Sequence, residues 1–501
     1  MFATTKTITM HGIQPIEIEV QVCIARGLAG FTIVGLPDKT VNESKDRIRT
    51  TFHAIDFTMP HKRITINLSP ANLLKDGTHY DLPIILAMLI TYGAIPENSL
   101  DKYIIMGALS LNGKITGVKS VLAAALYAKQ NNMGLICPMD NAYETKFIKS
   151  NNKILTIATL KELIDYLNGD ISDEQLNISN NDISDMIMGS NNDMLLIEDV
   201  IGQSSSKRGM MIAAAGRHNI LLMGPPGIGK SMLAKRLKYL MPPLDEDDLL
   251  EINIIQSVFG SSHSDDNFLQ KPPFRAPHHT SSTAAIIGNI KKAGEITLAH
   301  KGILFMDEFP EFSRQVIDGL RQPIEEKKVT IARATDTFVY PCEFQLVAAL
   351  NPCKCGYIND RNLACKQAPI CGEKYLHKIR GPILDRFDLQ LMMQSVNNLK
   401  EISDDNSLST ANIKEIVARV HMIQKARDVS INTLNYDKLL QYFKIDKQSE
   451  DMLDNLINKK IISMRKWKQV IKVARTIADI EESDIVSSSH MHEALYYRIM
   501  L

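Results

Sequence analysis

One stretch of eight residues, 224–231 with the sequence GPPGIGKS, constrains this chain more than any other. It follows a short apolar run, 220–223, and precedes a segment with helical pattern, 232–241. A glycine-rich loop between a strand and a helix lets backbone N–H groups turn inward around a polyphosphate. We therefore expect a phosphate-binding loop in which Lys230 reaches the β/γ oxygens and the Ser231 hydroxyl ligates Mg²⁺. The members of this phosphate loop are Gly224, Pro225, Pro226, Gly227, Ile228, Gly229, Lys230 and Ser231.

A second motif complements the loop. Residues 302–306 form an apolar run typical of a buried strand, and two acids, Asp307 and Glu308, follow it directly. In a phosphate-loop enzyme Asp307 would hold Mg²⁺, through water, and Glu308 would polarise the water that attacks the γ-phosphate. The alternative is a buried strand followed by a solvated acidic turn. Together the two motifs predict ATP hydrolysis.

Length and charge bound the remaining interpretations. The chain has 501 residues, 45% of them hydrophobic, which is enough for two or three domains with their own cores. Lys plus Arg and Asp plus Glu number 57 each, so any DNA contact must come from local basic patches. The longest apolar run, 82–90, contains Pro83 and is far shorter than the about 20 residues of a membrane span. The chain also begins without a signal-peptide pattern, so we expect a cytoplasmic protein without membrane contact.

Composition and pattern divide the chain into four parts. Residues 1–167 carry period-two strands at 16–22 and 63–68 and helical segments at 81–92 and 120–131. An acidic linker, rich in Asn, Ser and Asp, is expected at 168–194. The nucleotide-binding core is expected at 195–403 and a helical lid at 404–501, where nearly every segment has helical period from Thr410 onward. The fold class is therefore α/β.

Two polar residues extend the ATPase interpretation. Asn351 follows another buried-strand run, 344–350, where its side chain would orient the attacking water or sense the γ-phosphate. The alternative for Asn351 is a turn asparagine before a proline. Arg386 stands beside an apolar turn and, in a ring of subunits, would neutralise transition-state charge on a neighbour's ATP. A local ion pair with Asp385 or Asp388 is the alternative for Arg386.

Over nearly its full length, the chain resembles the magnesium-chelatase-like ComM/YifB family of AAA+ ATPases. Besides the phosphate loop and the acidic strand end, several ordered runs carry the resemblance. They are DVIGQ at 199–203, AAAGRHN at 213–219, FRAPHHT at 274–280, GEITLAH at 294–300, LRQP at 320–323, NPC at 351–353, DRFD at 385–388 and VARTIAD at 473–479.

The resemblance implies roles that spacing alone does not give. Asn351 matches the sensor-1 asparagine, Arg386 the arginine finger and Arg465 the sensor-2 arginine of the lid. It also implies a hexameric ring and ATP-driven branch migration of DNA during recombination. Members carry a β-hairpin before sensor 1, for which residues 328–333 and 337–340 are the candidate strands.

The expected hairpin offers basic residues to DNA. Lys327, Lys328 and Arg333 would project into a central pore, where six copies multiply a weak phosphate contact. The alternative is a solvated charged edge that protects a short hairpin from pairing with other chains.

The N-terminal part resembles the Lon-protease-like (S5-like) α+β domain that opens this family. The relevant segment is LKDGTHYDLP at 74–83. In the proteases a serine nucleophile stands shortly after the glycine, and here His79 takes that place, while Lys119 aligns only loosely with the catalytic lysine. We therefore expect a binding or assembly module without peptidase activity, with Thr78 and Lys119 as the residual argument against this.

Four of the seven cysteines fall close together, which in a cytosolic protein points to metal more than to disulfides. They are Cys353, Cys355, Cys365 and Cys371. A tetrahedral zinc site would pin the loop between sensor 1 and the arginine finger, although C-x-C is not the usual C-x₂-C pattern. Zn²⁺ and four reduced thiols both remain open. Adjacent His278 and His279 would point in different directions, which favours a structural or interface role over metal binding.

Three functions remain open. The first, a hexameric DNA motor using ATP and Mg²⁺, requires turnover that rises with branched or single-stranded DNA. The second is a chelatase-type motor that remodels a protein partner, for which DNA has no effect. The third is a non-enzymatic assembly module, which the intact Lys230, Asp307, Glu308 and Arg386 disfavour. A chelatase motor subunit usually lacks a Lon-like domain, so the resemblance favours the first.

Overall fold

The computed structural model divides the chain into two compact units. The first comprises residues 1–190 and 250–268, and the second 191–249 and 269–501. The structure describes residues 1–55, 57–59, 61–148, 152–172, 194–260, 269–289, 292–332, 337–356, 358, 365–366, 368–379, 382–394, 409–427, 440, 442–459 and 463–498. Most of the expected linker and the expected boundary between core and lid therefore lie outside the described residues.

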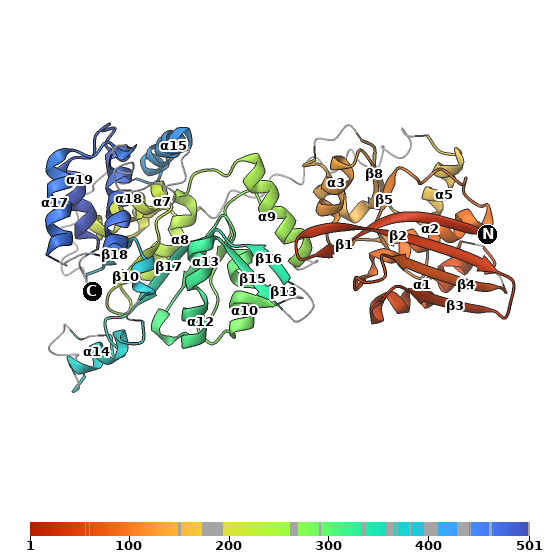
Figure 1. Cartoon of the computed structure of the whole chain (residues 1–501), viewed down its shortest axis with the longest axis horizontal. Coiled ribbons are helices and arrows are strands. Elements are labelled where there is room, and N and C mark those ends of the chain that lie inside the picture. Colours follow the sequence, from red (N-terminus) through yellow and green to blue (C-terminus); the bar gives the residue numbers. More distant parts are fainter. Residues whose placement is uncertain are drawn as a thin grey trace. The chain divides into compact units, whose positions relative to one another are not determined.

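The first unit is built on a seven-stranded mixed sheet in the order β3-β4-β2-β1-β5-β8-β9. Strand β2 (Gln14–Ala25) is central and alternates, burying Ile18, Val20 and Val22 on one face. Helix α2 (Asp81–Tyr92) packs against β1 and β2 and is apolar on all sides, so it forms the middle of this core. Figure 1 shows the long strands of this unit side by side.

The other elements of the first unit are β1 (Phe2–His11), β3 (Gly30–Val34), α1 (Lys39–Ala54), β4 (Arg63–Ser69), β5 (Tyr103–Ile105), β6 (Ala108–Leu109), β7 (Ile115–Thr116), α3 (Val121–Gln130), β8 (Gly134–Pro138), α4 (Ala142–Thr145), β9 (Ile154–Ile157) and α5 (Leu160–Asn168). Both period-two strands and both helices expected from the sequence are present as β2, β4, α2 and α3.

A segment distant in sequence completes the first unit. Residues 250–268 belong to it, and they include most of helix α9 (Glu246–Phe259). Leu250 and Ile254 pack on the apolar cluster of β1, β5 and α3. The Ser257 hydroxyl donates a hydrogen bond to buried Glu144 at 2.5 Å. From the sequence this segment was expected in the nucleotide-binding core, 195–403.

The second unit contains a five-stranded parallel sheet in the order β11-β14-β17-β10-β18. Its strands β10 (Ile220–Met223) and β17 (Gln345–Leu350) are buried at every position, as expected for strands covered on both faces. The remaining strands are β11 (Phe274–Arg275), β14 (Ile303–Met306) and β18 (Leu389–Met392). Helices α7 (Ser204–Gly216) and α8 (Lys230–Leu240) contribute buried side chains to its core.

Smaller elements connect these strands. They are α10 (Thr283–Ile287), β12 (Gly288–Asn289), β13 (Lys292–Ala293), α11 (Glu295–Leu298), α12 (Arg314–Gly319), α13 (Arg321–Glu326), β15 (Lys328–Ala332), β16 (Thr337–Pro341), α14 (Ile370–Leu376) and the 3₁₀ turn η6 (Leu384–Arg386). Strands β15 and β16 pair as an antiparallel hairpin.

The C-terminal elements are helices, and they share one apolar core with the sheet. They are α15 (Thr410–Arg427), α17 (Lys447–Asn458), α18 (Met464–Ile480) and α19 (Ser488–Tyr496). Trp467 of α18 is completely buried in that core. Figure 1 shows α17, α18 and α19 gathered together, consistent with their mutual contacts. The mixed α/β fold class with a parallel sheet is confirmed. Within the described ranges, no helix is both long and apolar enough to cross a bilayer.

A buried ion pair fixes the start of α2. Asp81 is fully buried and accepts hydrogen bonds from Arg47 Nε at 2.6 Å and from the backbone N–H of Leu109 at 3.3 Å. Ser44 also donates to this carboxylate. One side chain therefore connects α1, α2 and β6.

We predict that Asp81→Ala lowers the free energy of unfolding by about 3 kcal/mol, because it leaves the Arg47 charge without its partner. Urea denaturation followed by far-UV circular dichroism measures this change. The matched control is Asp46→Ala, whose side chain is 83% exposed and 3.5 Å from Arg49. It should change stability by no more than about 0.5 kcal/mol. Equal effects of the two substitutions would contradict the prediction.

Candidate nucleotide site

Three neighbouring strands bring the candidate residues to one edge of the parallel sheet. In the pairing of β10 with β17, Met223 lies opposite Leu350, and in the pairing of β14 with β17, Met306 lies opposite Ala348. The next residues along these three strands are Gly224, Asn351 and Asp307. The carboxyl ends of parallel strands form the usual ligand edge of such sheets.

Lys230 is buried beneath the phosphate loop. Its ammonium donates to the carbonyl oxygens of Gly224 and Pro225, both at 2.8 Å, and to Asn351 Oδ1 at 2.9 Å. These acceptors are neutral. Burial lowers the pKa of Lys230, and the nearby charge of Asp307 partly offsets that shift. A buried cation held by neutral oxygens is suited to receive an anion, so the site fits a polyphosphate.

The loop backbone leaves room for such a ligand. Gly229, immediately before α8, has φ 94°, and a Cβ added there would meet nothing within 4 Å. The positive φ therefore requires glycine, while the space beside it is open. The backbone N–H groups of the first turn of α8 begin at this point, which is the arrangement that binds phosphates.

Two oxygen donors that fit Mg²⁺ meet beside the loop. The Ser231 hydroxyl donates to Asp307 Oδ2 at 2.7 Å. Hydroxyl and carboxylate oxygens are the ligands that Mg²⁺ prefers in nucleotide sites. The structure therefore brings together the loop lysine, the loop serine, the strand-end aspartate and Asn351, as the sequence analysis expected.

Glu308 has a strained backbone and an unexpected partner. Its φ is 51°, a conformation that costs a residue with a side chain about 1–3 kcal/mol. Its Oε2 lies 3.2 Å from Nδ1 of His279, whose ring stacks on His278 with centroids 4.2 Å apart. Sequence reasoning gave His279 no place in the site. The one sequence signal for His279 was its place in the FRAPHHT run, one of the runs that carry the family resemblance.

The two candidate arginines share one carboxylate. Arg386 Nη2 lies 2.7 Å from Glu325 Oε1, and Arg465 forms an ion pair with the same oxygen. Glu325 belongs to α13 and Arg465 to α18. Arg386 is buried, whereas the Arg465 side chain is 45% exposed. Arg386 thus forms an ion pair within its own chain. Its partner is Glu325, and not Asp385 or Asp388.

The three basic candidates for DNA binding, Lys327, Lys328 and Arg333, differ in their surroundings. Lys327 forms an ion pair with Glu343, which also binds Lys301 at 2.8 Å. Burial alone would raise the pKa of Glu343, but the hydrogen bonds from both lysines outweigh it and hold the pKa at about 2. This pairing is therefore present above the usual glutamate pKa and lost only as the pH falls toward 2. Lys328 at the start of β15 is exposed, and Arg333 lies outside the described residues.

Three of the four clustered cysteines form one close group, and the fourth, Cys365, contacts one member of it. The sulfur atoms of Cys353, Cys355 and Cys371 lie within 4.8 Å of one another. Cys353 Sγ is 3.0 Å from Cys355 Sγ, and Cys365 Sγ is 3.3 Å from Cys371 Sγ.

The N-terminal unit does not assemble a peptidase dyad around His79. The ring of His79 is hydrogen-bonded to the carbonyl of Ile8 at 2.9 Å, and burial lowers its pKa to about 4. Lys119 is exposed, and Thr78 lies in a short 3₁₀ turn. A buried histidine held by a backbone carbonyl has a structural role here.

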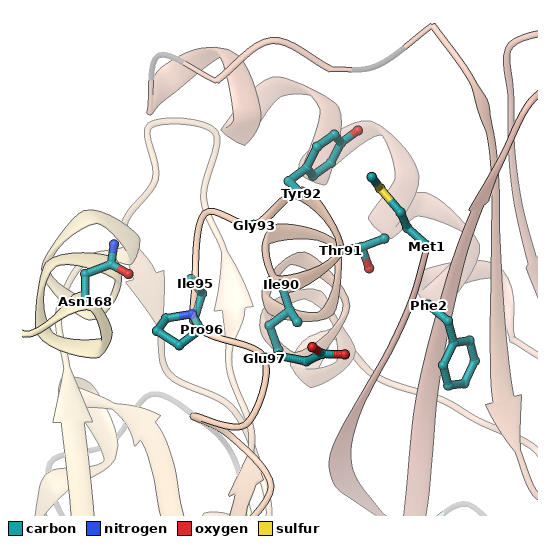
Figure 2. A pocket seen from close by; sticks show the side chains of 10 residues that line it. All are labelled: Met1, Phe2, Ile90, Thr91, Tyr92, Gly93, Ile95, Pro96, Glu97 and Asn168. Atoms are coloured by element: carbon teal, nitrogen blue, oxygen red, sulfur yellow. The ribbon is translucent and has the colours of Figure 1, made fainter.

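A hollow of about 560 Å³ lies elsewhere in this unit, at the end of α2 (Figure 2). Its lining includes Met1, Phe2 and Tyr92, with Glu97 and Asn168 as polar groups, and contains no lysine or arginine. Glu97 would repel a polyphosphate, and the N-terminal ammonium of Met1 already donates to the carbonyl of Ile24 at 3.4 Å, so the hollow is not the nucleotide site.

Taken with the sheet order and the lid, the edge site defines a phosphate-loop ATPase of the AAA+ class. Residues 196–401 match the family described as "Magnesium chelatase, subunit ChlI", residues 20–141 match "Subunit ChlI of Mg-chelatase" and residues 407–498 match "Magnesium chelatase, subunit ChlI C-terminal".

Relatives extend this match over the whole chain. It is 37% identical over 496 residues to competence protein ComM of Haemophilus influenzae, covering 98% of this chain and 96% of that protein. It is also 37% identical over 494 residues to YifB of Escherichia coli, with 97% and 95% covered. The chain belongs to the ComM/YifB family of magnesium-chelatase-like AAA+ ATPases. The family implies ATP and Mg²⁺ as ligands.

A shorter likeness concerns proteases. A stretch of 55 residues is 46% identical to the archaeal Lon protease of Methanothermobacter thermautotrophicus, covering 11% of this chain and 8% of that protein. It agrees with the Lon-like component of the expected architecture.

We predict that His279→Ala lowers kcat for ATP by about tenfold with little change in KM, since a hydrogen bond to a charged group contributes about 1.5 kcal/mol. Steady-state phosphate release over a range of ATP concentrations measures both constants. His492→Ala is the matched control, because His492 is an exposed histidine of α19. Similar losses in the two variants would show that His279 does not position Glu308.

Proposed function

We propose that this chain is an ATP-hydrolysing motor that acts on DNA as a hexameric ring, in branch migration or strand separation during recombination or natural transformation. The observation that carries the ATPase part is the cluster of Lys230, Asn351, Ser231 and Asp307 at one sheet edge. The DNA part is supported by the similarity of 98% of this chain to a relative that is named a competence protein.

In this proposal the phosphate loop supplies the first step. On ATP binding, the Lys230 ammonium exchanges neutral carbonyl oxygens for charged β/γ oxygens, which strengthens its hydrogen bonds. Gly227, Ile228 and Gly229, followed by the first turn of α8, would present their backbone N–H groups to the same phosphates, whereas Pro225 and Pro226 have none. Bound Mg²⁺, held through Ser231 and Asp307, would neutralise charge that develops on the transferred phosphoryl group.

Water attack depends on two further side chains. Glu308 accepts the proton of the attacking water, and His279 fixes the direction of that carboxylate. Asn351 lies next to Lys230, so it is placed to sense the γ-phosphate.

Arg386 and Arg465 provide the argument for a ring. Each would have to exchange Glu325 for a phosphate to act in catalysis. We propose that Arg386 acts on the ATP of an adjacent subunit, where its charge stabilises the transition state, and that Arg465 is the sensor-2 arginine of the lid. A chain that acts on DNA and ATP in this way is expected in the cytoplasm.

The catalytic assignment predicts two different losses. Lys230→Ala should weaken ATP binding by at least about tenfold, because it removes charge-assisted hydrogen bonds. Glu308→Gln should keep nucleotide affinity and lower turnover by about 100-fold or more, the usual contribution of a general base. A fluorescent nucleotide titration and a phosphate-release assay separate the two. Tight ATP binding by the Lys230 variant would overturn the loop assignment.

The DNA assignment predicts that a four-way DNA junction raises ATP turnover by the purified chain, with Glu308→Gln as the background control. Lys328→Ala should weaken DNA binding for every sequence and lower the salt slope of log K by at least about 1. Fluorescence anisotropy at several salt concentrations measures that slope.

The matched control for Lys328 is Lys39→Ala, since the Lys39 side chain is 91% exposed and lies in the first unit. It should leave DNA affinity unchanged. Turnover that is indifferent to every DNA tested would overturn the DNA motor and favour a chelatase-type motor that remodels a protein partner.

A further inference from the structure

The four clustered cysteines lie between β17 and η6, in a segment that we call the cysteine loop (353–371). Disulfide bonds do not account for the arrangement, because none of the seven cysteines forms one. The sulfur–sulfur separations of 3.0 and 3.3 Å also exceed the about 2.0 Å of a disulfide. Four soft sulfur donors have therefore been gathered without being joined.

The separations suit a tetrahedral metal instead. With Zn–S bonds of about 2.3 Å, neighbouring sulfur atoms of a tetrahedron lie about 3.8 Å apart. The sulfur atoms of Cys353, Cys355 and Cys371 lie within 4.8 Å of one another, and those of Cys353 and Cys355 are 3.0 Å apart. Cys365 lies beside this group, with its sulfur 3.3 Å from that of Cys371, so a shift of the Cys365 side chain would complete the tetrahedron.

The local backbone allows the close C-x-C spacing. The N–H of Gly356 donates to the carbonyl of Cys353 at 3.0 Å, which closes a tight turn around Cys355. Gly356 has φ 87°, which only glycine adopts without strain. The turn brings the sulfur atoms of Cys353 and Cys355 to 3.0 Å from each other. The usual C-x₂-C knuckle has one more residue between its two cysteines.

We propose that one structural Zn²⁺ ion is bound here by four thiolates, those of Cys353, Cys355, Cys365 and Cys371. Four protein ligands leave no open position, so the ion is structural and not catalytic. Binding breaks four S–H bonds, forms four Zn–S bonds and releases four protons to solvent, with no change in oxidation state.

The zinc site is joined to the nucleotide site on two sides. A Cβ added to Gly356 would lie 2.5 Å from the Pro226 side chain, so the cysteine loop rests directly on the phosphate loop. Asn351, two residues before Cys353, accepts the hydrogen bond of Lys230. The metal therefore holds the segment that touches both Pro226 and Lys230. This consequence rests on the proposed nucleotide site, whereas zinc binding itself does not.

Metal content tests the first part. The full chain, purified under reducing conditions without chelator, should contain about one zinc per chain by mass spectrometry of the elements, since four thiolates fill one tetrahedral ion. Cys353→Ser and Cys371→Ser should lose it. Cys23→Ser, which changes an exposed thiol on β2, should retain it. Substitution by Co²⁺ should give the visible bands of a tetrahedral thiolate site.

A chain that binds neither zinc nor cobalt, with all four thiols reactive, would overturn the proposal, and so would iron as the bound metal. Because serine variants risk misfolding, zinc is also removed from the wild-type chain with a chelator, and circular dichroism checks that it stays folded.

Nucleotide affinity tests the coupling. The zinc-free chain should bind fluorescent ADP about tenfold more weakly, equivalent to about 1.4 kcal/mol, and added Zn²⁺ should restore the affinity. Unchanged affinity without zinc would overturn the coupling. Normal zinc content in a chain that binds no nucleotide would instead contradict the proposed function alone.

Discussion

The hydrogen bond between Lys230 and Asn351 depends on parallel pairing of β10 with β17, and the rest of the candidate site depends on that pairing. The register places the two strand ends level, so the loop after one meets the side chain after the other. Neighbouring β14 adds Asp307 at the same edge. A slip of one residue in β17 would turn Asn351 to the opposite face and separate it from the lysine.

Strain and charge are concentrated around this edge. Glu308 adopts a positive φ, and its carboxylate meets His279 from the segment after β11. Lys230 keeps its charge in a buried position with neutral acceptors. Without a ligand, the strained backbone of Glu308 and the buried charge of Lys230 each cost free energy that an ordinary surface residue does not. Such costs are common at functional sites that are preorganised for binding.

Much of this arrangement was predictable from sequence because strands and loops leave local patterns. The phosphate loop, the acidic strand end and Asn351 each follow an apolar run, and the parallel sheet then brings them together. Partners from other elements leave no such pattern. Nothing in the spacing indicated that His279 meets Glu308, that Glu325 binds two arginines or that Glu343 neutralises Lys327. The place of α9 was missed for the same reason, since its Leu250 and Ile254 pack on a core distant in sequence.

The burial of Trp467 in α18 has a practical consequence, because the chain contains one tryptophan. Its intrinsic emission therefore comes from the lid alone, without any labelling. A change in that emission on adding nucleotide would mark a rearrangement around α18, and energy transfer to a fluorescent nucleotide would measure how near the lid comes to it. The fourteen tyrosines can be avoided by excitation at the red edge, so this single indole is a native optical probe of nucleotide binding.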